Sequence, residues 1–135
     1  SAWRLAAEGD GLRAERLWAV RLPTVAPTYA QPIAWGGRLY SVDRFGELWV
    51  LNADSGAVLS RSWALRGHDV YAPVQVAGGL LVVSSDSGRL VVLEPGDAPT
   101  PRAAWMGDAF RSAVVFSGSS MFVRTLKAVV RFEVE

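Results

Sequence analysis

The residue types that most often carry catalysis are scarce in this sequence. Its 135 residues include one histidine and no cysteine. A Ser-His-Asp site would have to use His68, and no Gly-x-Ser-x-Gly turn is present to hold a nucleophilic serine. A cysteine nucleophile, a disulfide and thiolate metal ligands are excluded, and a single histidine argues against a zinc site. We therefore interpret His68 as a turn or surface residue and expect the chain not to be an enzyme.

Short motifs that would bind a metal or a phosphate are also missing. Asp54-Ser55-Gly56 and Asp86-Ser87-Gly88 look alike, but neither extends into an Asp-x-Asp-x-Asp-Gly calcium loop, and they occupy different positions in the pattern described below. No Gly-x-Gly-x-x-Gly or Walker loop opens a helix. Asp43-Arg44-Phe45-Gly46 is superficially similar to the Asp-Phe-Gly of kinases, but the other kinase motifs are absent. We expect no cofactor and no metal.

Composition and charge narrow the class of partner. The formal charge is +1, from 14 basic and 13 acidic residues that are scattered along the chain, so nothing predicts attraction to nucleic acid or to an anionic membrane. Half of the residues are hydrophobic and six are tryptophan, which favours a folded domain. No apolar run approaches the roughly 18 residues of a membrane span, and no signal peptide is visible. Because the sequence starts with Ser-Ala-Trp, we expect that its start has been cut or trimmed.

The elements that must position any site follow a sequence repeat with a period of about 42 residues. Gly36-Gly37 recurs as Gly78-Gly79, and Trp63 recurs as Trp105. A weaker third copy, GSSMFVRTLKAVVRFE, occupies residues 118–133, and the segment from Trp3 to Trp18 resembles the segment from Trp49 to Trp63.

Each repeat reads as four short strands separated by turns. The residues are rich in Val, Leu, Tyr and Trp, with Gly, Asp, Asn and Ser between the runs, and no stretch has a convincing helical period. Gly36-Gly37 supplies a tight hairpin, and Asp43 to Gly46 supplies the next turn. We expect an all-β chain, with the strands of the first complete repeat at residues 28–35, 38–42, 47–52 and 57–64.

Four antiparallel strands in a repeat of this length are typical of a propeller blade. Here the sequence resembles the PQQ-like (quinoprotein dehydrogenase-like) β-propeller repeat, over most of the chain and most clearly from Pro32 to Leu59. The matching residues are Gly37, Leu39, Tyr40, Gly46, Leu48, Leu51, Ala53, Ser55 and Gly56, then Gly79, Leu81, Gly88, Leu90 and Leu93.

Two departures from that pattern bear on the fold. The family places a tryptophan four residues after the glycine of its Asp-x-x-Thr-Gly motif, where it docks on the neighbouring blade. Here that position is Ser60, so we expect Trp63 and Trp105 to dock instead. A WD40 propeller is the alternative, because Gly67-His68 precedes a similar repeat, although no Trp-Asp dipeptide exists.

Counting strands predicts an incomplete ring. A third strand at residues 3–6 and a fourth at 16–22 would end a preceding blade (1–22), followed by blades at 23–65 and 66–106 and a final partial blade at 107–135. These make thirteen strands, whereas propellers close with four or more blades. The open ends would be covered by the remaining blades of a larger propeller or by self-association that completes a ring.

The resemblance implies a function in interaction. Many relatives with this repeat are non-catalytic, such as the lipoprotein of the outer-membrane β-barrel assembly machinery and sensor domains of bacterial kinases. We therefore expect the C-terminal blades of a non-catalytic, bacterial scaffold or sensor that binds a protein partner. Relatives of this kind favour the periplasm or cell envelope. The alternative, a fragment of a PQQ-dependent dehydrogenase, lacks the vicinal cysteines of that family.

Propeller geometry also predicts where a partner would bind. Loops between blades share one face with the turns that join the second and third strands of each blade. Aromatic residues and arginines on that face are the usual interface anchors. The alternative is that Tyr71 and Phe110 pack between blades and the charges form a solvated rim. The predicted interaction face consists of Tyr29, Arg44, Phe45, Arg66, His68, Asp69, Tyr71, Phe110 and Arg111.

Overall fold

The structure is a computed structural model that describes residues 1–133 of the chain. Within these residues it contains antiparallel strands and turns and no helix, so no helix is available to cross a membrane. The strands are β1 (Ala2–Glu8), β2 (Gly11–Trp18), β3 (Ile33–Trp35), β4 (Arg38–Val42), β5 (Glu47–Asn52), β6 (Val58–Trp63), β7 (Gln75–Ala77), β8 (Leu80–Ser84), β9 (Arg89–Glu94), β10 (Thr100–Met106), β11 (Val115–Ser117), β12 (Ser120–Arg124) and β13 (Val129–Glu133).

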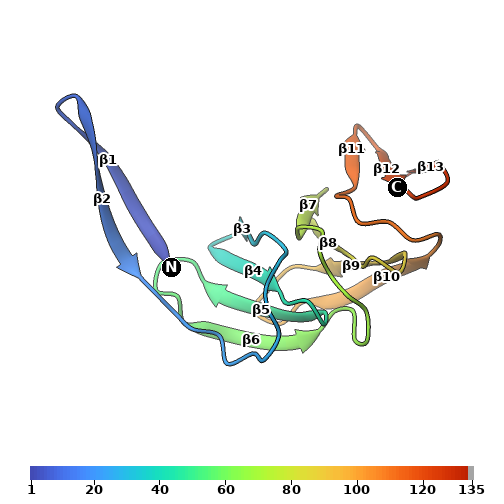
Figure 1. Ribbon diagram of the computed structural model, residues 1–135, viewed down its shortest axis with the longest axis horizontal. Helices are drawn as coiled ribbons and strands as arrows, with labels where there is room; N and C mark the ends of the chain where they lie inside the picture. The colour runs from blue at the N-terminus through green and yellow to red at the C-terminus, as the bar shows by residue number, and fades with distance from the viewer. Residues whose placement is uncertain (134–135) are drawn as a thin grey trace.

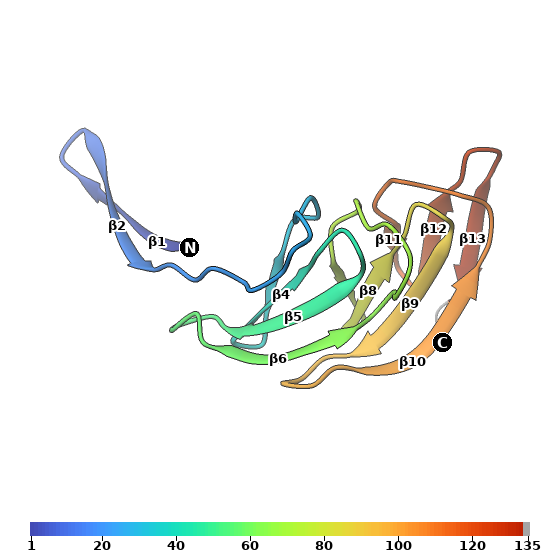
Figure 2. The same ribbon diagram turned by 60° about the horizontal axis from the view of Figure 1, so that its bottom comes forward.

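The thirteen described strands form a hairpin and three sheets in chain order. We call β3–β6 the first blade, β7–β10 the second blade and β11–β13 the third blade; the first two have four strands and the third has three. Figures 1 and 2 show the blades side by side, with the hairpin β1–β2 extending away beyond the first blade and the third blade at the opposite end. The sheets do not close on themselves. The predicted all-β fold, with four-stranded blades in an incomplete ring, is confirmed.

The predicted strand positions are most accurate in the first blade. β4 and β5 have the predicted bounds, because glycine turns fix both of their ends. The first predicted strand, residues 28–35, shrinks to the three residues of β3, which pair with β4 only from Ile33 to Trp35. Residues 28–32 form no strand, and Ala30 among them packs in the core between the first and second blades.

One predicted strand is wrong. Residues 16–22 were expected to form the fourth strand of the preceding blade, but β2 begins at Gly11 and ends at Trp18. The turn at Gly9, whose φ is +59°, pairs Glu8 with Gly11 and thereby sets the register of the hairpin. Trp18 pairs with Ala2, the first residue of β1, so β1 has no further residue with which residues 19–22 could pair.

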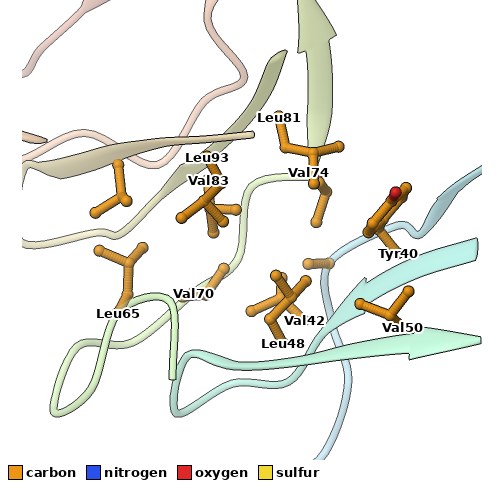
Figure 3. Packing of buried hydrophobic residues seen from close by; sticks show 12 residues of the cluster. Tyr40, Val42, Leu48, Val50, Leu65, Val70, Val74, Leu81, Val83 and Leu93 are labelled. Atoms are coloured by element: carbon orange, nitrogen blue, oxygen red, sulfur yellow. The ribbon is translucent and has the colours of Figure 1, made fainter. Parts of the chain in front are cut away.

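A buried apolar cluster joins the first and second blades. Because side chains alternate across a strand, Leu48 and Val50 of β5 face the second blade, where Leu81 and Val83 of β8 meet them. Residues of the connecting loop, including Val70, fill the space between the sheets (Figure 3). The blades are therefore held together by a continuous core rather than by the chain connection alone.

A second cluster joins the second and third blades, and Trp105 lies at its edge. The ring of Trp105 packs edge-on against Phe132 at 5.0 Å between centroids and tilts against Phe110 at 6.4 Å. Val82 and Leu90 supply the apolar surface beneath these rings. Docking of Trp105 on the next blade is thus confirmed.

Trp63 does not dock on the second blade. Trp63 pairs with Glu47 at the start of β5, whereas Trp105 pairs with Leu90, the second residue of β9. Both outer pairs carry a β-bulge at the same place of the repeat, but the connection from Leu51 to its partner Val58 is one residue shorter than that from Leu93 to its partner Pro101, and this offsets the two registers by one residue. Because a one-residue offset reverses the face of a strand residue, Trp63 points away from the second blade and is 47% exposed, contrary to the prediction.

The turn between the second and third strands of each blade is capped by its own first residue. The Asp43 carboxylate accepts hydrogen bonds from the backbone N–H groups of Phe45 and Glu47, at 2.9 and 3.0 Å. The hydroxyls of Ser85 and Thr125 accept equivalent backbone bonds in the second and third blades. All three side chains are buried, so they stabilise these turns from within.

The hairpin β1–β2 is attached to the first blade through Trp18. The indole Nε1–H of Trp18 donates to the Ala53 carbonyl at 3.0 Å, and its ring lies against Gly56, where an added Cβ would come within 2.5 Å of it. Ser60 makes a comparable contact from the first blade, its hydroxyl donating to the Asp97 carbonyl of the second. The sequence prediction missed this role of Trp18. The repeat gave no signal for it, because it matches Trp18 to Trp63, which does not dock.

Candidate interaction face

The predicted face is built where the β4–β5 turn meets the loop that leads into the second blade. The Val70 N–H donates to the Arg44 carbonyl at 2.7 Å, which aligns the two segments. The Arg44 guanidinium donates to Asp69 Oδ2 from Nη2 at 2.9 Å and from Nε at 3.2 Å. These bonds to Arg44 hold the pKa of the Asp69 carboxyl below its usual range, and Asp69 raises the pKa of Arg44.

Two tyrosines extend this ion pair across the face. The Tyr71 hydroxyl donates to the same Asp69 oxygen at 3.4 Å. Its ring stacks on the ring of Tyr29, with 5.6 Å between centroids and 19° between planes. Tyr29, which precedes the first blade in the chain, is 57% exposed, so an aromatic surface remains open above the ion pair.

Arg111 brings the third blade into the same cluster. Its guanidinium lies 5.5 Å from the centroid of the Tyr71 ring and 3.5 Å from an Asp86 oxygen. The Asp86 N–H donates to the Asp69 carbonyl at 2.9 Å, which links the β8–β9 turn to the loop before β7. We call the connected set the rim cluster; it consists of Tyr29, Arg44, Asp69, Tyr71, Asp86 and Arg111.

Three predicted face residues lie beside the rim cluster rather than in it. Phe45 is 44% exposed, and its ring centroid is 5.8 Å from the Arg44 guanidinium. The Arg66 guanidinium lies over the Trp63 ring, 5.5 Å from the ring centroid. His68 Nδ1 is 2.7 Å from the Ser87 hydroxyl, which places it in a turn-to-turn hydrogen bond, as the interpretation of His68 as a turn residue expects.

Phe110 lies beneath the face. It is 2% exposed and belongs to the core between the second and third blades. It forms the floor of a cleft of about 560 Å³ that Arg111, Leu126 and Asp86 also line. Phe110 therefore supports the surface by packing between blades, which is the alternative that the sequence left open for it.

The acidic side chains of the described residues are dispersed or already paired. No group of three His, Cys, Asp or Glu side chains within residues 1–133 is placed to hold a metal ion. The most buried carboxylates, Asp43 and Glu47, are engaged in a turn cap and in an ion pair with Arg61. The face offers arginines paired with aspartates, aromatic rings and hydrogen-bonding groups, which suits recognition of another surface.

Comparisons with known proteins bear on the fold. No protein-family model matches the chain, and no curated protein matches it. Among solved structures, it is similar to BamB from Moraxella catarrhalis, with a TM-score of 0.63 and 12% identity over 75% of this chain; it spans 30% of the BamB chain. It is also similar to the computationally designed Ika4 protein, with a TM-score of 0.55 and 12% identity over 90% of this chain and 99% of that one. Together with the open array of antiparallel blades, the likeness to BamB shows that this chain is a segment of a β-propeller.

Proposed function

We propose that this propeller segment is a protein-interaction module, a scaffold or a sensor, that binds a partner through the rim cluster and Phe45 without catalysing a reaction. The observation that carries the proposal is the continuity of the cluster. Segments from both sides of the first blade, from the second blade and from the start of the third contribute to one set of contacts. A partner that engages it would contact three blades at once.

The arrangement supports binding because its anchors are already ordered. Arg44 is fixed by two hydrogen bonds to Asp69 and by backbone bonds on both sides, from its N–H to Pro27 and from Val70 to its carbonyl. Side chains held in place before binding lose little conformational entropy when a partner arrives. Tyr29 and Phe45 remain about half exposed, so they offer apolar area beside this rigid polar frame.

The exposed side of Arg111 and the aromatic stack favour a partner that carries carboxylates and aromatic rings. Arg111 has a side chain that is 74% exposed, and its only ion pair within residues 1–133 is the 3.5 Å contact to Asp86. A carboxylate of a partner could approach the open side of its guanidinium, and an aromatic ring could extend the stack of Tyr29 on Tyr71.

A peptide-display experiment tests this function. Peptides selected from a random library on the wild-type protein should be enriched in acidic and aromatic residues. Their affinity should fall by about tenfold or more for Arg111→Ala and for Phe45→Ala, the range expected of interface anchors. Arg13→Ala removes an exposed arginine on the hairpin, so it serves as the matched control and should leave affinity unchanged.

Peptides that bind Arg44→Ala, Phe45→Ala and Arg111→Ala as tightly as wild type, with all three variants folded by circular dichroism, would remove this face from consideration.

A further inference from the structure

The hairpin β1–β2 has one apolar and one charged face, and neither is covered. Residues directly opposite each other in an antiparallel pair share a face, which places Trp3, Leu5 and Leu12 on one side, with Arg16 at its end, and the ion pair of Arg4 with Glu15 on the other. Trp3 is 54% exposed, Leu5 65% and Leu12 76%. Large apolar side chains at such exposures on one face mark a surface that binds another.

The pairing of the hairpin shows which blade surface its apolar face corresponds to. Trp3 pairs with Arg16 as Trp49 pairs with Arg61 in the first blade. In the first blade the neighbours of Trp49, Leu48 and Val50, face the second blade, so Trp49 lies on the opposite side of its sheet. The apolar face of the hairpin is therefore the side that meets the preceding blade in a propeller.

The third blade exposes the converse surface. Met121 and Val123 face the second blade, so Phe122 and Val129 lie on the outer side, where they pair with Arg131 and Arg124. Val129 is 68% exposed, and Val115, which pairs with Phe122, is 61% exposed. The first and second blades pack against the next blade in the chain on this same side.

We propose that a second copy of this chain covers these surfaces, with the apolar hairpin face of one copy on the outer face of the third blade of the other. At each contact between blades, the side of one blade that faces the following blade packs on the side of the next that faces the preceding one. The outer face of the third blade is a surface of the first type, and the apolar face of the hairpin is one of the second type. In Figures 1 and 2 they lie at opposite ends of the molecule, so they meet between copies rather than within one. The contact is head to tail, and two copies with a suitable rotation would close a ring.

The size of the surfaces matches this contact. Two strands of seven and eight residues cover roughly 24 by 10 Å, or about 240 Å² per face, from the ordinary strand rise and spacing. A closed pair of copies would bury such a face four times, about 1,000 Å² in all, which is near the lower limit for a specific association. The edges of β1 and β13, which lack a strand neighbour in the described residues, add hydrogen-bonding groups to the same contacts.

Analytical ultracentrifugation with two charged variants tests the proposal. Wild type should form dimers as its concentration rises, while Leu5→Glu and Val129→Lys should each weaken dimerisation by about tenfold or more, because each replaces an apolar side chain of the contact with a charged one. A mixture of the two variants should recover dimers, since one contact is then native and the other pairs Glu with Lys. Ala6→Glu, on the charged face of the hairpin, is the matched control and should dimerise like wild type.

The alternatives predict different results. A contact of hairpin with hairpin would be blocked by Leu5→Glu, left intact in Val129→Lys and not recovered by mixing. Both affected residues are exposed in the single chain, so the monomers should retain their unfolding midpoints. A wild-type protein that stays monomeric at its highest soluble concentration, or variants that fail to complement each other, would overturn the proposal.

Discussion

At the residue scale, the contact of Trp18 with Gly56 is the most specific link between the hairpin and the blades. Gly56 has a φ of +74°, and an added Cβ would lie 2.5 Å from the indole ring. Gly56→Ala should therefore displace Trp18, in addition to the cost of about 1 kcal/mol for a left-handed alanine. We expect faster hydrogen exchange of the β2 amides in this variant.

Gly79→Ala is the matched control, because Gly79 has a φ of +79° and open space around its α-carbon. It should incur the backbone cost alone and leave β2 exchange unchanged. Equal effects of the two substitutions on β2 would show that Trp18 does not anchor the hairpin.

The Asp69 carboxyl provides a test of the rim cluster at the same scale. Its pKa is lowered by the hydrogen bonds from Arg44, so it stabilises the fold at pH above the value of the unfolded chain, about 3.9. That contribution is lost as the pH falls through the lower folded value. Carbon NMR should show the Asp69 midpoint below its ordinary value in wild type and shifted upward in Arg44→Met; an unshifted midpoint would contradict the pairing.

At the scale of elements, the two tryptophans at equivalent positions of the sequence repeat should differ in their effect on stability. Trp105 packs on Phe110 and Phe132 between blades, whereas Trp63 is on the outward face under Arg66. Trp105→Ala should lower the free energy of unfolding by about 2–4 kcal/mol, and Trp63→Ala by less than about 1 kcal/mol. Urea unfolding measures both, and similar losses would mean that Trp63 also docks.

The same two residues show what the sequence predicts and where it stops. The repeat, the bounds of β4 and β5 and the glycine turns follow from local patterns, because turn chemistry and alternation are encoded within a few residues. The side of the sheet on which Trp63 lies depends on where pairing resumes after the turn between β5 and β6, one residue sooner than after the turn between β9 and β10, and the repeat spacing does not show this difference.

The rim cluster was predictable in part for a similar reason. Propeller geometry places Arg44, Asp69 and Tyr71 on one face, and these residues do meet. The stack of Tyr29 on Tyr71, and the burial of Phe110, depend on how loops of different blades pack, which no local pattern specifies. The extent of β2 was missed because its end is set by the length of β1 rather than by its own residues.

At the scale of the whole molecule, stability should be graded along the chain. Both faces of the second blade pack against neighbouring blades, whereas the hairpin touches the rest of the chain through Trp18. Amides of β8 and β9 should exchange slowest and those of β1 fastest at low protein concentration. Native-state hydrogen exchange measures this order, and uniformly slow exchange throughout β1 would contradict it.

The buried caps at Asp43, Ser85 and Thr125 have a consequence for how such molecules diversify. Because each cap stabilises its turn from inside, the next residues at the tip, such as Arg44 in the first blade and Leu126 in the third, can be exchanged without loss of the turn. Substitutions at the tips could therefore change recognition one blade at a time while the architecture stays the same.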